Sequence, residues 1–324
     1  MSSIFGKEKL IMNKNIGKPN LTVFSETLIE LGKENPDLFV VTSDSRGSGK
    51  LVPFGEALPD QIVEVGIAEQ NLVGIAAGLA SAGKTVFAVS PASFLTARAL
   101  EQIKNDVAYA GNNVNLVGIS SGVSYGALGA THHAIHDYAV LRCINNLTVV
   151  APGDNFEARE AVRAAAKFPT PVYLRFGKRA LENVHPPDEE FALGKAITVR
   201  EGTEAAIIAS GETLYPALAA AELLAGEGIS CRVVSMHTLK PFYTEAVLKA
   251  AKECGAVVTV EEHSVYGGLG EACASVLARS AVRGRFEILG FPDEYLVNGS
   301  QLEMYEHYQL STGGISTAVK KMLH

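Results

Sequence analysis

The feature that most constrains the fold is a repeated alternation of short, valine-rich apolar runs with segments of helical periodicity. Each run is hydrophobic on both faces, which is typical of a parallel strand buried between two layers of helices. This alternation predicts an α/β class of fold with a doubly wound sheet. We expect strands at Leu38–Ser43, Thr85–Ser90, Val114–Ser120, Leu147–Pro152 and Pro171–Phe176, and helices within Phe24–Asn35, Leu95–Gly111 and Asn155–Phe168.

A proline-rich, acidic stretch without periodicity, Glu182–Gly194, divides the chain in two. Beyond it the alternation resumes, with expected strands at Glu204–Ser210, Ser230–Met236 and Ala256–Glu262. The 324 residues are enough for two cores of ordinary size. We therefore predict two doubly wound domains, over residues 20–184 and 194–324, with a linker at 185–193 and a mobile N-terminal tail at 1–19.

Charge, hydropathy and cysteine spacing exclude several classes of function. The net charge of −7 argues against a nucleic-acid partner, which would require a basic face. No continuous run of about 18 apolar residues is present, so no membrane insertion is expected. The cysteines are far apart and form no CxxC pair, which argues against a disulfide framework or a zinc site and fits a reducing cytoplasm. They are Cys143, Cys231, Cys254 and Cys273.

One charge interrupts a helix of small and apolar residues. Glu69 stands at the head of this helix within Val63–Gly83, where Gly74 and Gly78 form a GxxxG spacing. Such a surface lets another helix approach closely, and we interpret it as a tight helix pair across a subunit interface. The carboxylate at the edge of that contact would be partly desolvated and able to share a proton with a ring nitrogen. The alternative is a solvated first-turn acid, favoured by the helix dipole.

The stretch VEVGIAEQNLVGIAAGLASAG resembles the pyrimidine-domain helix of thiamine-diphosphate enzymes of the transketolase type. The resemblance covers nearly the whole chain from Asn20 and implies a pyrimidine-binding domain followed by a transketolase C-terminal domain. It implies that Glu69 bonds the aminopyrimidine ring of thiamine diphosphate and so promotes the cofactor's nucleophilic ylid. The segment SFLTARALEQIKNDVAY places Phe94 where an aromatic ring stacks on the pyrimidine. Ile67 matches the residue that holds the cofactor bent; an ordinary core isoleucine is the alternative.

The resemblance also assigns Asp44 and Arg98 to the cofactor site, whereas Ala97 and Leu100 replace further aromatic residues of the family. Complete transketolases bind the diphosphate and Mg²⁺ through a GDG motif in an additional half, and this sequence contains no GDG. We therefore expect thiamine diphosphate and Mg²⁺ as cofactors, no metal ligand in this chain, and a separate N-terminal transketolase subunit as the partner. The small-residue helix suggests a two-fold contact between copies and an α2β2 assembly.

A histidine pair in SYGALGATHHAIHDYAVLR marks the expected substrate pocket. The letters ATH resemble the PTH motif of transketolases, so His132 is expected to bond the hydroxyls of the donor sugar and to transfer protons. His133 and His136 are expected to be helix or surface residues. Leu128 stands where the family has an aspartate that reads the C2 hydroxyl of the acceptor, and a buried leucine cannot accept that hydrogen bond.

The anion-binding arm of the pocket also departs from the family. Arg175 in YLRFGK matches the arginine that holds the distal phosphate, and Ser48 matches a serine of the same subsite. Thr22 and Ser120 stand where an arginine and a histidine are usual. The planar donors of Arg175 still predict an anionic sugar, with a sulfonate and a branched sugar phosphate as the candidates.

These observations favour the pyrimidine-binding subunit of a two-component transketolase, which moves a two-carbon ketol unit from a ketose to an aldehyde. The β subunit of a 2-oxoacid dehydrogenase E1 component is the main alternative, because its length and architecture are similar. A single-chain deoxyxylulose phosphate synthase shares the GIAEQ motif but would need the missing half in the same chain. A scaffold that has lost its site is a further alternative, although Glu69, Phe94 and His132 are all present.

Overall fold

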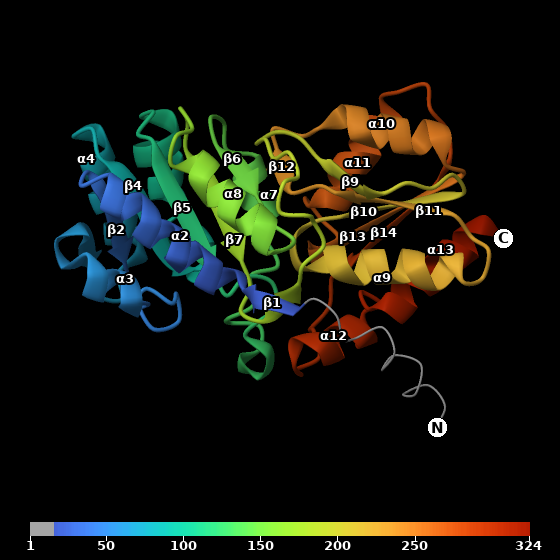
Figure 1. Ribbon diagram of the computed structural model, residues 1–324, viewed down its shortest axis with the longest axis horizontal. Helices are drawn as coiled ribbons and strands as arrows, with labels where there is room; N and C mark the ends of the chain where they lie inside the picture. The colour runs from blue at the N-terminus through green and yellow to red at the C-terminus, as the bar shows by residue number, and fades with distance from the viewer. Residues whose placement is uncertain (1–15) are drawn as a thin grey trace.

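The computed structural model describes residues 16–324, which form two α/β units side by side (Figure 1). The first unit contains a seven-stranded sheet in the order β12-β6-β7-β5-β4-β2-β3, parallel throughout except at β12. The predicted strands of this domain are all present, as β2, β4, β5, β6 and β7. The bounds are β2 (Leu38–Thr42), β3 (Ile62–Glu64), β4 (Thr85–Pro91), β5 (Val114–Ile119), β6 (Thr148–Val150), β7 (Val172–Phe176) and β12 (Thr238–Lys240).

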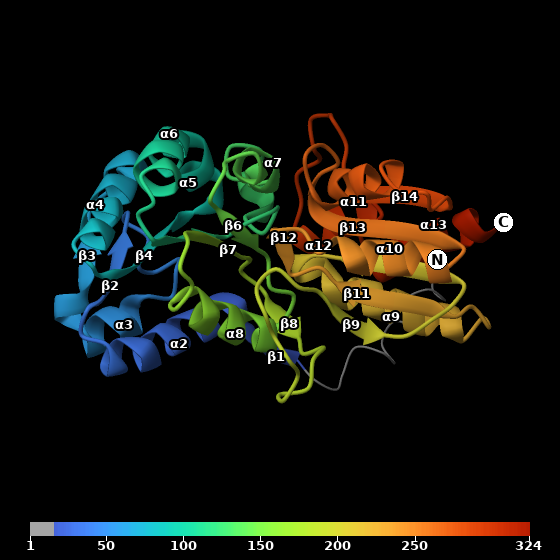
Figure 2. The same ribbon diagram turned by 90° about the horizontal axis from the view of Figure 1, so that it is seen from above.

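Helices cover both faces of this sheet, as Figure 2 shows. Two apolar cores separate them from the strands, one built around Phe24 and Phe176 and the other around Leu72 and Leu95. The strands are buried between these cores, which is why their sequences are apolar on both faces. One face carries α2 (Asn20–Glu34), α3 (Val52–Ala57) and α8 (Asn155–Ala165); the other carries α4 (Glu69–Ser81), α5 (Ala92–Arg98), α6 (Leu100–Gln102), a π-helix (Ile103–Tyr109) and α7 (Asp137–Arg142).

The second unit is built on a five-stranded sheet in the order β14-β13-β10-β11-β9, in which only β9 is antiparallel. In Figure 1, α9 and α13 lie below this sheet and α10 and α11 above it, so this unit is also doubly wound. The bounds are β9 (Ile197–Arg200), β10 (Ala205–Ala209), β11 (Cys231–Ser235), β13 (Ala256–Ser264), β14 (Arg285–Phe291), α9 (Leu214–Ala225), α10 (Thr244–Glu253), α11 (Leu269–Ala278), α12 (Gln301–His307) and α13 (Thr312–Leu323).

Two short strands connect parts of the chain that the sequence pattern treats as separate. β1 (Ile16–Pro19) pairs antiparallel with β8 (Ala180–Glu182), because the Asn155 side chain bonds the main-chain N–H and C=O of Lys18 and fixes this segment. The prediction of a mobile tail is therefore wrong for residues 16–19, and its residues 1–15 lie outside the described residues. β12 comes from beyond the predicted linker yet completes the edge of the first sheet. The linker itself, 185–193, contains no helix or strand.

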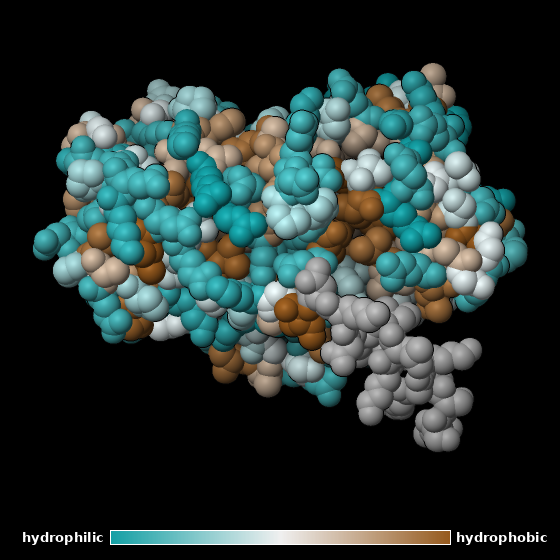
Figure 3. All heavy atoms as spheres, in the orientation of Figure 1, coloured by the Kyte–Doolittle hydropathy of each residue, from teal (hydrophilic) through white to brown (hydrophobic). Residues whose placement is uncertain are grey.

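The face of the molecule in Figure 3 is mainly hydrophilic, with apolar side chains exposed in separate patches. Within residues 16–324, no helix combines the length and the hydropathy needed to cross a bilayer.

Candidate active site

The loops beyond the carboxyl ends of the parallel strands carry most of the predicted site residues. In an open α/β sheet, the crevice at this edge is the usual place for a ligand. Residues that are far apart in the sequence therefore become neighbours. Asp44 and Ser48 follow β2, Glu69 follows β3, Phe94 and Arg98 lie on α5 after β4, and Ser120, Leu128 and His132 follow β5.

Glu69 is the first residue of α4, and only 4% of its surface is exposed. Both carboxylate oxygens accept hydrogen bonds from Nη1 of Arg98, each at 3.0 Å. The alternative of a solvated first-turn acid is therefore wrong. The positive end of the helix and the guanidinium together stabilise a negative charge in this buried position.

Aromatic rings continue from this ion pair along the edge of the sheet. The guanidinium carbon of Arg98 lies 4.5 Å from the centre of the Phe94 ring, which in turn meets His132 edge-on at 5.3 Å between centroids. Glu69, Arg98, Phe94 and His132 thus form one connected group. Nδ1 of His132 lies 3.0 Å from the hydroxyl of Thr131, so its Nε2 has no hydrogen-bond partner among the described residues.

Two residues that the sequence analysis missed extend this group. Tyr125 packs edge-on against the other side of His132, at 5.1 Å between centroids, and Nζ of Lys178 lies 4.6 Å from the centre of the Tyr125 ring. Lys178 is exposed and forms no ion pair within residues 16–324. Its position two residues after β7 was the available signal. We call the following six residues the contact chain: Glu69, Arg98, Phe94, His132, Tyr125 and Lys178.

Arg175 does not fulfil the role that the sequence predicted. Its side chain is only 1% exposed, and its Nε donates to Asp137 at 2.8 Å while Nη2 donates to the main-chain oxygen of Glu262 at 2.7 Å. The guanidinium also lies 4.6 Å from the centre of the Tyr138 ring. Arg175 is inside β7, whose side chains are buried on both faces, so its donors are used within the protein and cannot hold a substrate anion.

The other two histidines are not free surface residues. His133 is 4% exposed, and its Nε2–H donates to the main-chain oxygen of Gly126 at 2.9 Å. Burial lowers the pKa of His133, so its imidazole is neutral, with Nδ1 buried and unpaired within the described chain. His136 is half-buried, with Nε2 3.3 Å from the Thr96 hydroxyl. The prediction of helix or surface positions is wrong for His133, because the following loop folds it inward.

A pocket of about 480 Å³ lies beside Phe94 and Arg98. Its wall includes His133 from the first unit and the loop at Glu294 and Tyr295 from the second. The buried Ser93 hydroxyl, which also lines it, has no hydrogen-bond partner among residues 16–324. The chain thus offers unpaired polar atoms beside an aromatic ring and a buried acid, which is a suitable wall for a flat heterocycle.

The remaining predicted residues lie at the same edge but outside the contact chain. Asp44 is exposed with a positive φ of 51°, and its N–H donates to a Glu64 carboxylate oxygen at 2.6 Å. The Ser48 hydroxyl donates to the main-chain oxygen of Ser45 at 3.2 Å. Ser120 is fully buried and has a φ of 53°, and its hydroxyl has no partner in the described part of the chain. The Ser120 hydroxyl is therefore available as a donor.

Two apolar side chains at the site are open to solvent. Ile67 is 73% exposed, which contradicts the alternative of a core isoleucine, and Leu128 is 57% exposed, so it is not the buried wall that the sequence suggested. The loop of Leu128 projects outward because Gly126 and Gly129 pack against the loop at 298–299 and both have positive φ. On α4, a methyl group added at Gly74 or Gly78 would meet no atom within 4 Å. The small-residue face therefore points away from this chain.

The residues fit one end of the expected cofactor. The buried acid and the half-buried ring of Phe94 suit the aminopyrimidine, since one can bond a ring nitrogen and the other can stack. Within residues 16–324, no cluster of three or more His, Cys, Asp or Glu side chains could hold a metal ion.

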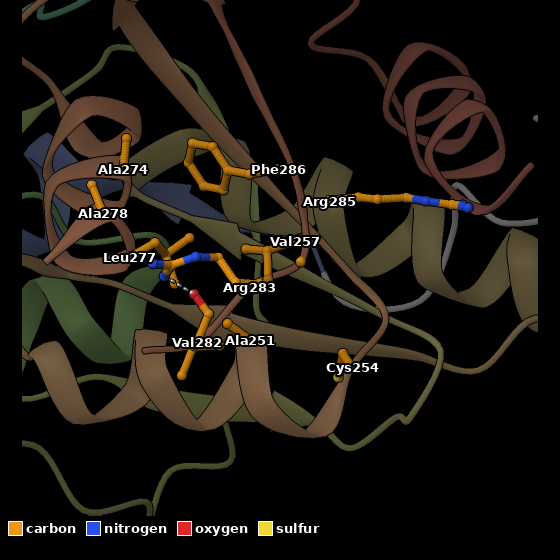
Figure 4. Close-up of a pocket in the computed structure, with 11 residues that line it drawn as sticks. Ala251, Cys254, Val257, Ala274, Leu277, Ala278, Val282, Arg283, Arg285 and Phe286 are labelled. Atoms are coloured by element: carbon orange, nitrogen blue, oxygen red, sulfur yellow. Dashed lines mark hydrogen bonds between the residues drawn. The ribbon is translucent and has the colours of Figure 1, made fainter. Parts of the chain in front are cut away.

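A separate cavity of about 260 Å³ lies in the second unit, between α10, α11 and the start of β14 (Figure 4). Nη1 of Arg283 donates to the main-chain oxygens of Ser280 and Val282, and burial raises the pKa of the Cys254 thiol. The cavity shares no residue with the contact chain and its cation is engaged, so we assign it no part in the site.

Comparison with known proteins relates the whole described chain to one family. The family model described as transketolase, pyrimidine binding domain, matches residues 19–183, and the one described as transketolase, C-terminal domain, matches residues 194–315. One of the two subunits of the apulose-4-phosphate transketolase of Phocaeicola vulgatus is 48% identical over 293 residues, which are 90% of this chain and 93% of that protein.

Two further similarities concern transketolases made from separate subunits. The 6-deoxy-6-sulfo-D-fructose transketolase subunit of Clostridium sp. strain MSTE9 is 37% identical over 83% of this chain and 86% of that protein. A solved structure of a split gene transketolase, described as an inactive beta4 tetramer, is 37% identical, with a TM-score of 0.86 over 95% of this chain and 98% of that one. These similarities favour a transketolase subunit over an E1 β subunit.

Proposed function

The chain belongs to the transketolase family as a subunit with the pyrimidine-binding and C-terminal domains, and we propose that it completes an active site with a second polypeptide. The reaction is the transfer of a two-carbon ketol unit from an anionic ketose to an aldehyde. The observation that carries this proposal is the contact chain, which joins a buried acid, a stacking ring, an imidazole and a free cation along one edge. We place the pyrimidine-binding domain at 20–184, the linker at 185–193 and the C-terminal domain at 194–324.

The residues of this chain divide the work along the contact chain. Glu69 bonds the pyrimidine ring of thiamine diphosphate, Phe94 stacks on that ring, and Ile67 supports the bent shape of the cofactor. When bound, thiamine diphosphate supplies the carbanion nucleophile that attacks the ketose carbonyl. His132, whose Nε2 is unpaired within residues 16–324, bonds sugar hydroxyls and moves protons near neutral pH. Asp44 contributes at the cofactor edge.

We assign the distal anion of the sugar to Lys178 instead of Arg175. Lys178 is the exposed cation at the far end of the contact chain, whereas the donors of Arg175 are engaged. Ser48 and Ser120 provide hydroxyl groups at the same edge. Two similar subunits are named for apulose 4-phosphate and for 6-deoxy-6-sulfo-D-fructose, which both carry an anionic group. This supports a branched sugar phosphate or a sulfonated ketose as the donor.

The second polypeptide is proposed to hold the diphosphate and Mg²⁺, because this sequence contains no GDG motif. The open glycine face of α4 suits a contact between two copies of this chain, which gives an α2β2 assembly. The split-gene relative is described as inactive when it is a tetramer of β chains, which supports dependence on a second subunit. We place the enzyme in the cytoplasm, since all four cysteines are free.

The test is reconstitution with the N-terminal subunit. The complex, with thiamine diphosphate and Mg²⁺, is assayed for ketol transfer from apulose 4-phosphate, from 6-deoxy-6-sulfofructose and from xylulose 5-phosphate. We expect activity only from the complex, and a preference for one of the first two donors. Turnover by this chain alone would contradict the division of labour, and decarboxylation of pyruvate without ketol transfer would contradict the reaction.

A further inference from the structure

Arg98 makes two contacts that define its role. Its Nη1 donates to both carboxylate oxygens of Glu69, at 3.0 Å each, and its guanidinium plane lies over Phe94 at 4.5 Å. The two partners differ in exposure, since the side chain of Arg98 is 51% exposed and that of Glu69 only 4%. A half-exposed, flexible cation thus neutralises a buried acid.

The same two groups serve the cofactor in the proposed function. An aminopyrimidine needs the Glu69 carboxylate for a ring nitrogen and the Phe94 face for stacking. A guanidinium is also flat and also presents N–H donors at its edge, so it satisfies both groups in the same way. A guanidinium and a pyrimidine ring cannot both lie against the same face of Phe94.

We propose that Arg98 is an internal occupant of the pyrimidine subsite, which stabilises Glu69 in the unassembled subunit and is displaced when the ring binds. This inference rests on the proposed function. A buried carboxylate without a partner is costly, so a subunit that is made separately needs a substitute for the cofactor. Displacement also removes a charge that opposes proton sharing between Glu69 and the ring.

The surroundings of Arg98 allow this displacement. The residue ends α5, so its side chain is held at the stem alone, and it lines the pocket of about 480 Å³ together with Glu294. The guanidinium therefore has room to turn and a second carboxylate on the wall of that space. Arg98 acts as a positioning residue, because it influences the reaction through Glu69.

The first experiment measures the stability of the full chain without its partner. Arg98→Gln should lower the thermal midpoint at pH 7.5, because Glu69 stays buried without a cation. Adding Glu69→Gln to that variant should restore most of the loss, because the buried group is then neutral. Arg163→Gln is the matched control, since Arg163 is an exposed arginine that pairs with Glu30 and Glu160 away from the site. Additive effects of the two site substitutions would overturn the proposal.

The second experiment measures the dissociation constant of thiamine diphosphate, with Mg²⁺, for the reconstituted complex. Arg98→Gln should bind the cofactor about fivefold more tightly, which is the weight of a partly exposed ion pair that no longer has to be broken. Arg163→Gln should bind it like the wild type. An unchanged or weaker affinity of Arg98→Gln, with normal binding by the wild type, overturns the inference alone. A wild-type complex that does not bind thiamine diphosphate overturns the proposed function as well.

Discussion

Two arginines near the carboxyl edge of the first sheet have opposite surroundings. Arg98, on the open edge, is half-exposed and meets a single acid, whereas Arg175, at the junction of the two units, is 1% exposed and bound on several sides. The second group is dense, because the Tyr173 hydroxyl also donates to Asp137 at 2.8 Å. Burial, and not residue type, thus separates a cation that can respond to a ligand from one that holds the protein together.

The junction is an ionic cluster between the units. Arg175 lies on β7 of the first unit, and Glu262 lies on β13 of the second, where Nε2 of Gln301 donates to Glu262 at 2.7 Å and to Glu212 at 2.8 Å. Substitutions at the open edge should therefore change activity and leave stability nearly unaltered. Substitutions in the junction cluster should do the reverse.

The largest effect is expected at the open edge, from Glu69→Gln. An amide can hydrogen-bond the ring nitrogen but cannot share its proton, so turnover should fall by about 10²–10⁴. The direct measurement is deuterium exchange at the thiazolium C2 of the reconstituted complex. Exchange at the wild-type rate would remove Glu69 from the reaction.

Arg175→Met should produce the largest loss of stability. The substitution leaves Asp137 and Glu262 buried without their cation, which costs about 3–5 kcal/mol of unfolding free energy. Urea denaturation of the full chain measures this loss, and the control is Arg163→Gln. If Arg175→Met unfolds like the wild type but no longer uses anionic sugars, the sequence-based assignment of Arg175 was correct after all.

The junction cluster should also make stability depend on pH. Burial raises the pKa of Glu262 from 4.5 to about 7, so the folded protein binds this proton more tightly than the unfolded chain does. Its contribution to stability is therefore complete below pH 4.5 and is lost as the pH rises to about 7.

Denaturation curves across this pH range test the sign. Glu262→Gln should flatten the fall in unfolding free energy between pH 4.5 and pH 7. Glu56→Gln, an exposed acid on α3, should leave the slope as in the wild type. A steeper slope in Glu262→Gln would mean that this carboxyl is ionised in the folded protein at acid pH.

Lys178→Met sharpens the comparison between the two cations near β7. Loss of a charge-assisted bond to the distal anion should lower kcat/KM for an anionic donor by about 10–100-fold. The unfolding free energy should stay within about 0.5 kcal/mol of the wild type, because Lys178 is exposed. A matched loss with an uncharged ketose would show that Lys178 does not read the anion.

The smallest effect is expected from Leu128→Asp. An aspartate there would accept a hydrogen bond from an acceptor hydroxyl, and because the position is 57% exposed the gain is modest. We expect a shift of about fivefold in kcat/KM toward ribose 5-phosphate relative to the native acceptor. No shift would mean that Leu128 does not face the acceptor.

Much of this molecule could be predicted from periodicity. The eight predicted strands are present, because strands buried on both faces must be apolar throughout. Among the strands that were missed, β1, β8, β9 and β12 have three or four residues each, and partners elsewhere in the chain, such as Asn155 at β1, hold them in place. Short segments of this kind carry too few residues to show a period.

The sequence by itself determined the α/β architecture, the family and the positions of Glu69, Phe94 and His132, because motif letters and hydrophobic period are local properties. Only the tertiary structure decided which charges are free. Arg175 and Lys178 are three residues apart, yet one ends inside the protein and the other outside, because the chain leaves the sheet between them at Phe176. The availability of a charge depends on what surrounds it, and strands far apart in the sequence supply those surroundings.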